Sequence, residues 1–155
     1  MAASKGRNDP SKTVADTLSR ILANTYTLYI KTHNYHWNVT GPQFASLHTM
    51  FETQYTELAA AVDTIAERIR ALGHVAPGSY AAFSKLSEIK DAPESPPEAM
   101  QMIRELAADN ETLVRLANEA NDVAEENDDV ASGDMMIERM QVHSKAAWML
   151  RAHLE

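Results

Sequence analysis

Cysteine is absent from the 155-residue sequence, which excludes disulfide bonds and metal sites built from thiolates. A bound metal ion would therefore need histidine, aspartate and glutamate ligands, a set that suits iron, manganese or zinc. The sequence also lacks an apolar run of the roughly 20 residues that span a bilayer, and its first residues lack the apolar core of a secretory signal. These absences predict a soluble, cytoplasmic protein that does not bind membranes.

Basic residues are in the minority, with 14 Lys and Arg against 22 Asp and Glu and a formal net charge of −8. Duplex DNA binds clustered Lys and Arg, so this composition disfavours a general nucleic-acid surface. Glycine and proline are also scarce, and the alternation of β-branched residues that is typical of sheets is missing. We therefore expect a single domain of the all-α class.

Apolar residues recur at three- and four-residue spacings in four long segments, which predicts four amphipathic helices. Thr40-Gly41-Pro42 separates the first two, because proline cannot continue a helix interior, and Gly73 ends the second. The predicted helices cover about residues 11–39, 43–73, 95–126 and 130–154.

The segment between Gly73 and Pro97 is rich in Pro, Gly, Ser and Lys, and only residues 80–86 have the pattern of a short helix. A segment of this length can return along the whole bundle, so that the second and third helices point the same way. We therefore predict a ferritin-like four-helix bundle over residues 11–155, with a short extra helix in the crossover. Residues 1–10 are expected to form a flexible tail.

Candidate metal ligands lie on one side of the second helix, beside its apolar stripe: His48, Glu52, Asp63 and Glu67. The first two are about 15 residues from the last two, roughly 22 Å along a straight helix, so one ion cannot bind both pairs of the same helix. A second subunit packed antiparallel across a two-fold axis would bring one pair opposite the other. The pattern therefore predicts a site at a subunit interface, and His36, near the end of the first helix, is a further candidate.

A second interpretation is that these acidic residues form a solvated helix face, with Arg68 and Arg70 as partners, and that His48 has no special role. The Glu-x-x-His pairs that bind two irons inside an ordinary ferritin bundle do not occur in this sequence. The spacing of residues alone leaves both interpretations open.

The stretch from Lys31 to Gly73, with its His-Trp-Asn, Leu-His and Asp-x-x-x-Glu motifs, resembles the signature region of the Dps family (DNA-binding protein from starved cells). The ending VHSKAAWMLRAHLE resembles the last helix of that family, and the likeness covers nearly the whole chain from about Val14. The resemblance implies a homo-dodecameric shell that oxidises Fe(II), preferably with hydrogen peroxide and otherwise with dioxygen. The shell would store the ferric mineral and protect DNA from oxidative damage.

The resemblance also implies a ferroxidase site for two irons at the dimer two-fold axis, with zinc as an alternative occupant. His36, His48 and Glu52 would come from one subunit, and Asp63 and Glu67 from its neighbour. Glu52 stands where many members of the family have Asp, and this longer side chain puts the affinity for the second iron in doubt.

We also expect specific locations for several other residues. Trp37 resembles the aromatic residue that family members hold near the iron, where it could intercept a radical, and interface packing is the alternative. Asp129 and Asp134 lie where the resemblance implies channels at three-fold axes, so they are candidates for an iron-entry pore, with capping of the fourth helix as the alternative. Trp148 is expected in the core, and His143 has no ligand partner at a useful spacing.

The N-terminal tail, with Lys5, Arg7 and Lys12, is the candidate DNA-binding segment. Twelve tails could act together, but so few basic residues on an acidic shell predict weak, salt-dependent binding or none. The alternative function is a structural DNA-binding protein of the nucleoid with weak or no ferroxidase activity. A second alternative is a four-helix interaction module without metal chemistry.

Overall fold

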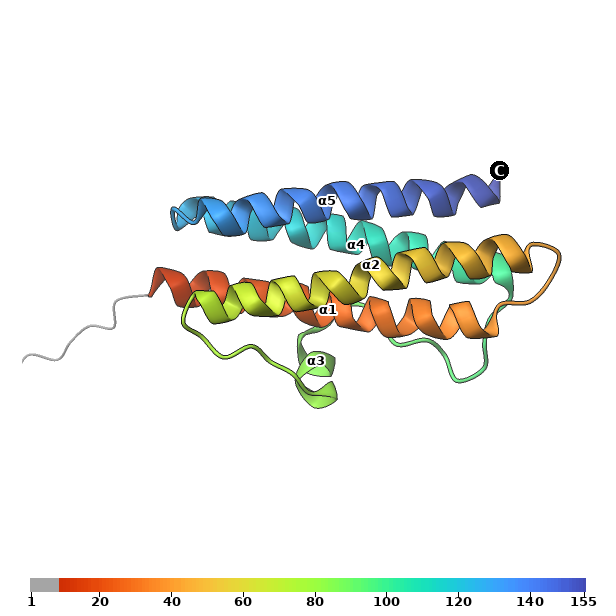
Figure 1. Ribbon diagram of the computed structural model, residues 1–155, viewed down its shortest axis with the longest axis horizontal. Coiled ribbons are helices and arrows are strands. Elements are labelled where there is room, and N and C mark those ends of the chain that lie inside the picture. Colours follow the sequence, from red (N-terminus) through yellow and green to blue (C-terminus); the bar gives the residue numbers. More distant parts are fainter. Residues whose placement is uncertain (1–8) are drawn as a thin grey trace, which may run out of the picture.

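The structure, a computed structural model that describes residues 9–155, consists of four long helices and one short helix (Figure 1). These are α1 (Pro10–Asn38), α2 (Phe44–Ala71), α3 (Tyr80–Leu86), α4 (Ala99–Glu126) and α5 (Val130–Arg151), followed by a 3-10 turn over Ala152–Leu154. No strand occurs in the described part of the chain. The predicted all-α class and the short helix of the crossover are confirmed. None of the helices of residues 9–155 combines the length and apolarity that crossing a bilayer requires.

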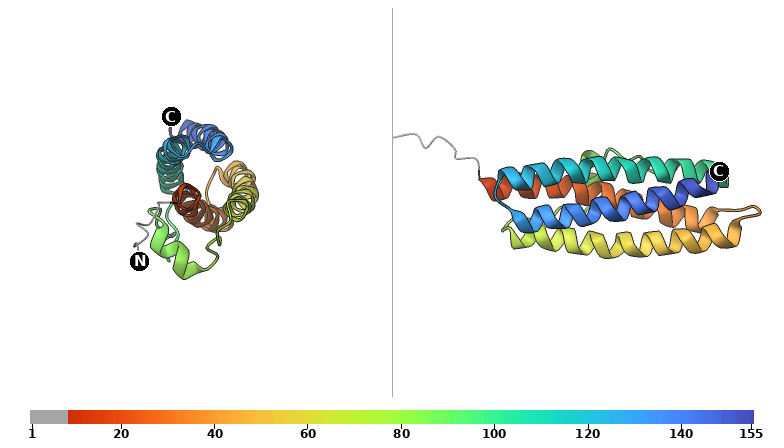
Figure 2. Two further views of the ribbon diagram at one scale, coloured as in Figure 1. Left: turned by 90° about the vertical axis from the view of Figure 1, so that its left-hand side faces the viewer. Right: turned by 90° about the horizontal axis from the view of Figure 1, so that it is seen from above.

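The long helices lie along a common axis as two antiparallel pairs (Figure 2). α1 packs mainly on α2, and α4 on α5, while contacts between α1 and α4 join the two pairs. α2 and α4 run in the same direction, as the long crossover between them requires (Figure 1). The remaining side, between α2 and α5, has no extensive close backbone contact.

Local sequence explains where the helices begin and end. The Asp9 carboxylate accepts a hydrogen bond from the Ser11 backbone N–H, and Pro10 occupies the first turn of α1, where a missing N–H costs little. Gly73, which follows α2, has a φ of +92°, a conformation that favours glycine. α4 begins at Ala99, later than predicted, because each proline of the pair 96–97 disfavours helical geometry in the residue before it.

The core consists of the apolar stripes of the four long helices, and fully buried side chains include Leu18, Phe51, Ile65, Leu106 and Leu150. The prediction that Trp148 belongs to the core was wrong, since its side chain is 66% exposed. Ala147 and Leu150 are the buried positions of this part of α5, and a step of one residue turns a side chain about 100° away from such a stripe.

Asn24 attaches the crossover to the bundle. Its side chain is fully buried, and its Oδ1 accepts hydrogen bonds from the backbone N–H groups of Glu88, at 2.9 Å, and Ile89, at 3.1 Å. In α3, the ring of Phe83 stacks on Tyr26 of α1 with their centroids 4.9 Å apart. The crossover is therefore held against the outer side of α1.

Candidate metal centre

His36 and His48 lie against each other where α1 and α2 approach the turn that joins them. Their imidazole rings are nearly parallel, with centroids 3.8 Å apart and an interplanar angle of 14°. Nδ1 of His36 is 2.7 Å from the carbonyl oxygen of His48, and Nδ1 of His48 is 2.7 Å from the carbonyl oxygen of His36. Because a carbonyl oxygen only accepts hydrogen bonds, each Nδ1 carries the hydrogen and donates it. In the neutral imidazole, the Nε2 of each ring then keeps a free lone pair.

This arrangement is the one that metal-binding histidines usually adopt. A metal-ligating imidazole almost always donates its other N–H to a carbonyl or carboxylate, which fixes both the tautomer and the orientation of the ring. Here the backbone carbonyl of each histidine supplies this support to the ring of the other across the α1–α2 connection. His36 is 7% exposed, so its ring is held in place while His48 is only partly covered.

The three candidate carboxylates lie on α2 and are exposed. Glu52 is one turn after His48, so it extends the histidine pair along the same helix face. Asp63 and Glu67 lie in the second half of α2, away from this end of the bundle. No three His, Cys, Asp or Glu side chains within residues 9–155 are grouped closely enough to hold a metal ion. One copy of the described chain therefore brings together only part of the predicted ligand set.

Aromatic rings surround the histidine pair on the side of α1. His33 stacks on Tyr55 with centroids 4.2 Å apart, and Tyr55 lies edge-on to His36 at 5.1 Å. The predicted near-site residue Trp37 contacts the ring of His33 at 3.9 Å, and 64% of its surface is exposed. Burial, and then the nearby His36, lower the pKa of His33 below its ordinary value. His33 therefore favours its neutral form.

The two predicted pore residues lie near the start of α5 in different surroundings. Asp129 caps the helix by accepting hydrogen bonds from the Ser132 backbone N–H, at 3.0 Å, and from Arg68 Nη2, at 2.7 Å. Burial opposes ionisation, but the bonds from Ser132 and Arg68 leave the pKa of Asp129 below its ordinary value. Asp134 is exposed and lines a shallow hollow of about 310 Å³ together with Glu125.

Most of the candidate DNA-binding tail lies outside the residues that the structure describes. Lys5 and Arg7 fall in residues 1–8, outside the described residues. Lys12 is on the first turns of α1 and forms an exposed ion pair with Asp16.

A buried polar network that residue spacing did not predict surrounds His143, which is 1% exposed. Its Nδ1 donates to Asn110 Oδ1 on α4 at 2.8 Å, and its Nε2 is 3.1 Å from Arg139 Nη2, which also bonds Glu57 of α2. Burial, and then the charge of Arg139, lower the pKa of His143 to about 3. The spacing of residues on α5 could place His143 on the core side, but it does not show that Asn110 of α4 bonds His143 or that Glu57 of α2 bonds Arg139.

Known proteins share the sequence pattern and the fold of this chain. The ferritin-like domain family matches residues 15–155. The chain is 41% identical to the DNA protection during starvation protein of Brevibacillus brevis over 142 residues, which cover 92% of this chain and 95% of the relative. A crystal structure of a Dps protein from Bacillus brevis superposes with a TM-score of 0.92 at 39% identity, covering 97% of this chain and 100% of that one. A Dps protein from Vibrio cholerae O1, described as a member of a broad superfamily of ferritin-like diiron-carboxylate proteins, has a TM-score of 0.89 at 30% identity, covering 94% and 92%.

Proposed function

Because the chain belongs to the Dps family of ferritin-like proteins, we propose that it is a ferroxidase that oxidises Fe(II) to Fe(III), preferably with hydrogen peroxide, at sites shared between two subunits. The subunits would assemble into a hollow dodecamer that stores the ferric product and so protects DNA. The observation that carries this proposal is the reciprocal hydrogen bonding of His36 and His48, which leaves both Nε2 atoms available to iron.

The proposed iron ligands are His36, His48 and Glu52 of one subunit together with Asp63 and Glu67 of its neighbour. Two observations support a shared site. The three carboxylates are exposed on the single chain, and the described residues of one chain contain no group of three ligands. An antiparallel α2 from a second subunit would supply the missing carboxylates across a two-fold axis.

Iron is the substrate of this reaction, and the ligand set suits both of its oxidation states. Imidazole nitrogen binds Fe(II) well, and carboxylate oxygen favours the harder, more highly charged Fe(III). One molecule of hydrogen peroxide accepts one electron from each of two ferrous ions, and its O–O bond breaks. The two ferric ions then take up water and release protons as they form oxide. Paired delivery of electrons avoids the one-electron step that releases hydroxyl radical. Trp37, exposed beside His33, would intercept radicals that still form.

Iron entry is proposed at the junction of α4 and α5. Exposed carboxylates attract cations, and Asp134 lies next to Glu125 on the surface there. Asp129 belongs to the same surface, but its bond to Arg68 neutralises part of its charge. Asp134 is therefore expected to contribute more than Asp129 to attracting Fe(II).

The test is ferrous oxidation by added hydrogen peroxide under anaerobic conditions, on shells whose assembly has been checked by size. The wild type should consume two irons per peroxide, and the variant His36→Ala with Asp63→Ala should lose the fast phase. A matched control, His153→Ala with Asp122→Ala, removes the same residue types from the C-terminal 3-10 turn and from α4 and should oxidise iron like the wild type. Equal rates in all three assembled proteins would refute the ferroxidase proposal.

The alternative function is a structural DNA-binding protein of the nucleoid with weak or no ferroxidase activity. The name of the Brevibacillus brevis relative, a DNA protection during starvation protein, is the observation that favours it. It predicts retardation of DNA in a gel, lost when Lys5, Arg7 and Lys12 are replaced by Gln and strongly weakened by salt. The acidic balance of the chain, with its formal charge of −8, leads us to expect weak retardation.

A further inference from the structure

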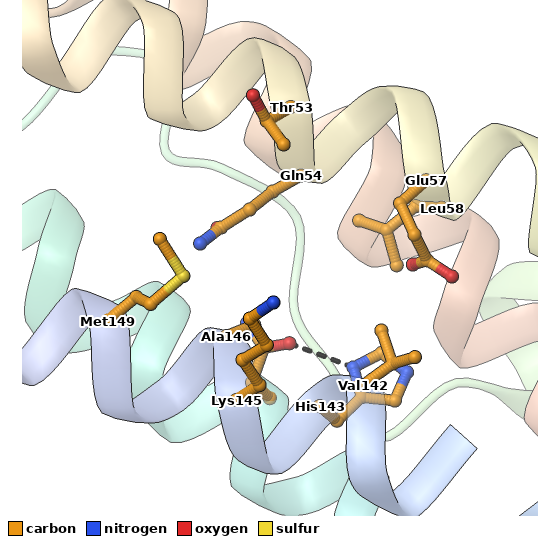
Figure 3. Close-up of a pocket in the computed structure, with 10 residues that line it drawn as sticks. Thr53, Gln54, Glu57, Leu58, Val142, His143, Lys145, Ala146 and Met149 are labelled. Atoms are coloured by element: carbon orange, nitrogen blue, oxygen red, sulfur yellow. Dashed lines mark hydrogen bonds between the residues drawn. The ribbon is translucent and has the colours of Figure 1, made fainter. Parts of the chain in front are cut away.

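A cavity of about 310 Å³ opens between α2 and α5, the two helices that have no extensive close backbone contact (Figure 3). Two ion pairs join these helices, Arg68 to Asp129 and Glu57 to Arg139. The cavity adjoins Glu57 and continues along α5 as far as Met149, beyond the reach of either ion pair.

One polar group in this cavity has no partner. Nε2 of Gln54 is buried and lacks a hydrogen-bond partner among residues 9–155. Figure 3 shows the Gln54 side chain extending from α2 into the space between the helices, toward the side where Met149 lies. A buried amide without a partner is unfavourable, so an oxygen atom placed in the cavity would stabilise it.

The remaining walls of the cavity are mostly apolar. Leu58 of α2 and Val142, Ala146 and Met149 of α5 line it. The thioether of methionine adapts to irregular shapes and makes favourable contacts with aromatic rings. A flat apolar ring would therefore find suitable contacts on both helices.

Lys145 lines the cavity and is exposed on α5, so its ammonium group can remain in water at the rim. The other charged groups of the cavity are paired, and they determine the charge of a suitable ligand. Glu57 binds Arg139, and His143, which also lines the cavity, uses both ring nitrogens in hydrogen bonds to Asn110 and Arg139. Placing an ion among these groups would leave its charge without a partner in an apolar surrounding. A neutral ligand fits this environment.

We propose that the cavity binds a small neutral molecule of the phenol type, with its ring between α2 and α5 and its hydroxyl group bonded to the amide of Gln54. The size is suitable, because small-molecule pockets begin at about 300 Å³ and an apolar cavity of about 150 Å³ holds benzene. Gln54 and Glu52 point about 160° apart around α2, so this site lies on the opposite side of the helix from Glu52 and is separate from the proposed iron ligands.

The experiment is titration of the assembled protein with p-cresol, followed by calorimetry, with toluene as a probe of similar shape that lacks the hydroxyl group. Gln54→Leu should weaken p-cresol binding about ten-fold, since it removes one hydrogen bond from a buried site, and should leave toluene binding nearly unchanged. Ala146→Phe fills the cavity and should abolish the binding of both probes. Gln141→Leu, a matched control at an exposed position of α5, should bind both probes like the wild type.

Three results would overturn the proposal. The first is that the wild type shows no heat of binding with p-cresol at millimolar concentration. The second is that the wild type and Gln54→Leu bind p-cresol with equal affinity. The third is that Ala146→Phe binds both probes as well as the wild type does. Should Ala146→Phe fail to assemble, the comparison of Gln54→Leu with Gln141→Leu still decides. Ferrous oxidation is not a readout here, so failure of this site and failure of the ferroxidase proposal are separate outcomes.

Discussion

Arg68 Nη2 on α2 donates to Oδ1 of Asp129, the N-cap residue of α5, at 2.7 Å. The same carboxylate accepts the backbone N–H and the hydroxyl of Ser132, and it is 12% exposed. One side chain therefore both begins α5 and attaches that helix to α2, on the side of the bundle where the two helices otherwise have little close contact.

Replacing Asp129 with Ala should lower the free energy of unfolding by about 1–2 kcal/mol, because the helix loses its cap and Arg68 loses its partner. Urea denaturation at fixed protein concentration measures the effect. Asp122→Ala removes an exposed carboxylate of α4 and should change the stability by less than about 0.5 kcal/mol. Equal stability of the two variants would show that the cap is replaced by water or by a neighbouring group.

His143 should make the stability of the protein depend on pH. Its pKa falls from 6.5 to about 3 in the folded state, so the unfolded state binds the additional proton. The contribution of neutral His143 to the free energy of unfolding is fully present above pH 6.5. It is lost as the pH falls toward 3, by up to roughly 1.4 kcal/mol per pH unit. His143→Gln should be less stable than the wild type at neutral pH and show a shallower loss below it. His153→Gln should keep the wild-type slope, and a slope unchanged in His143→Gln would contradict this account.

Removing the Asn24 side chain should release the crossover without unfolding the bundle. In Asn24→Ala the backbone N–H groups of Glu88 and Ile89 lose their acceptor, at an expected cost of about 1–3 kcal/mol. Amide hydrogen exchange should become much faster at Glu88 and Ile89 and stay slow in the core of α4. Asn118→Ala, at an exposed position of α4, should leave the exchange of both amides unchanged. Protected amides in Asn24→Ala would mean that Asn24 does not hold the crossover.

Mixing two inactive variants should restore activity if the iron site is shared between subunits. One variant is His36→Ala with His48→Ala, and the other is Asp63→Ala with Glu67→Ala. After joint unfolding and reassembly, half of the dimers would be mixed and each of these would contain one intact site, so we expect about one quarter of the wild-type rate. Ferrous oxidation measures it, and the separately reassembled variants are the controls. No recovery in well-assembled mixed shells would place all ligands on a single chain.

The periodicity of the sequence predicted the long helices, the crossover helix and the parallel direction of α2 and α4, because each depends on local spacing, prolines and glycines. It did not predict the position of Trp148, because burial on a helix depends on the angle from buried residues such as Ala147 and Leu150 and not on the size of an apolar side chain. Nor could it predict the network around His143, because Asn110, which bonds His143, and Glu57, which bonds Arg139, come from other helices.

The sequence likewise predicts only part of the geometry of the candidate metal centre. The positions of His36, His48 and Glu52 follow from two helices joined by a short turn. The bond from each imidazole to the backbone carbonyl of the other histidine depends on how the side chains pack. The place of Asp63 and Glu67 opposite this pair remains a prediction, because it depends on contacts with another copy of the chain.

The reciprocal bonds between His36 and His48 also bear on when the chemistry can begin. Only the ends of α1 and α2 and the short connection between these helices separate the two residues in sequence. Their contact is therefore local and can form as soon as α1 and α2 pair during folding. Under the proposed function, the carboxylates that complete the site arrive only when a second copy docks. A newly made monomer would then bind iron weakly and oxidise it slowly, so that association of subunits acts as a safeguard against forming ferric oxide outside a closed shell.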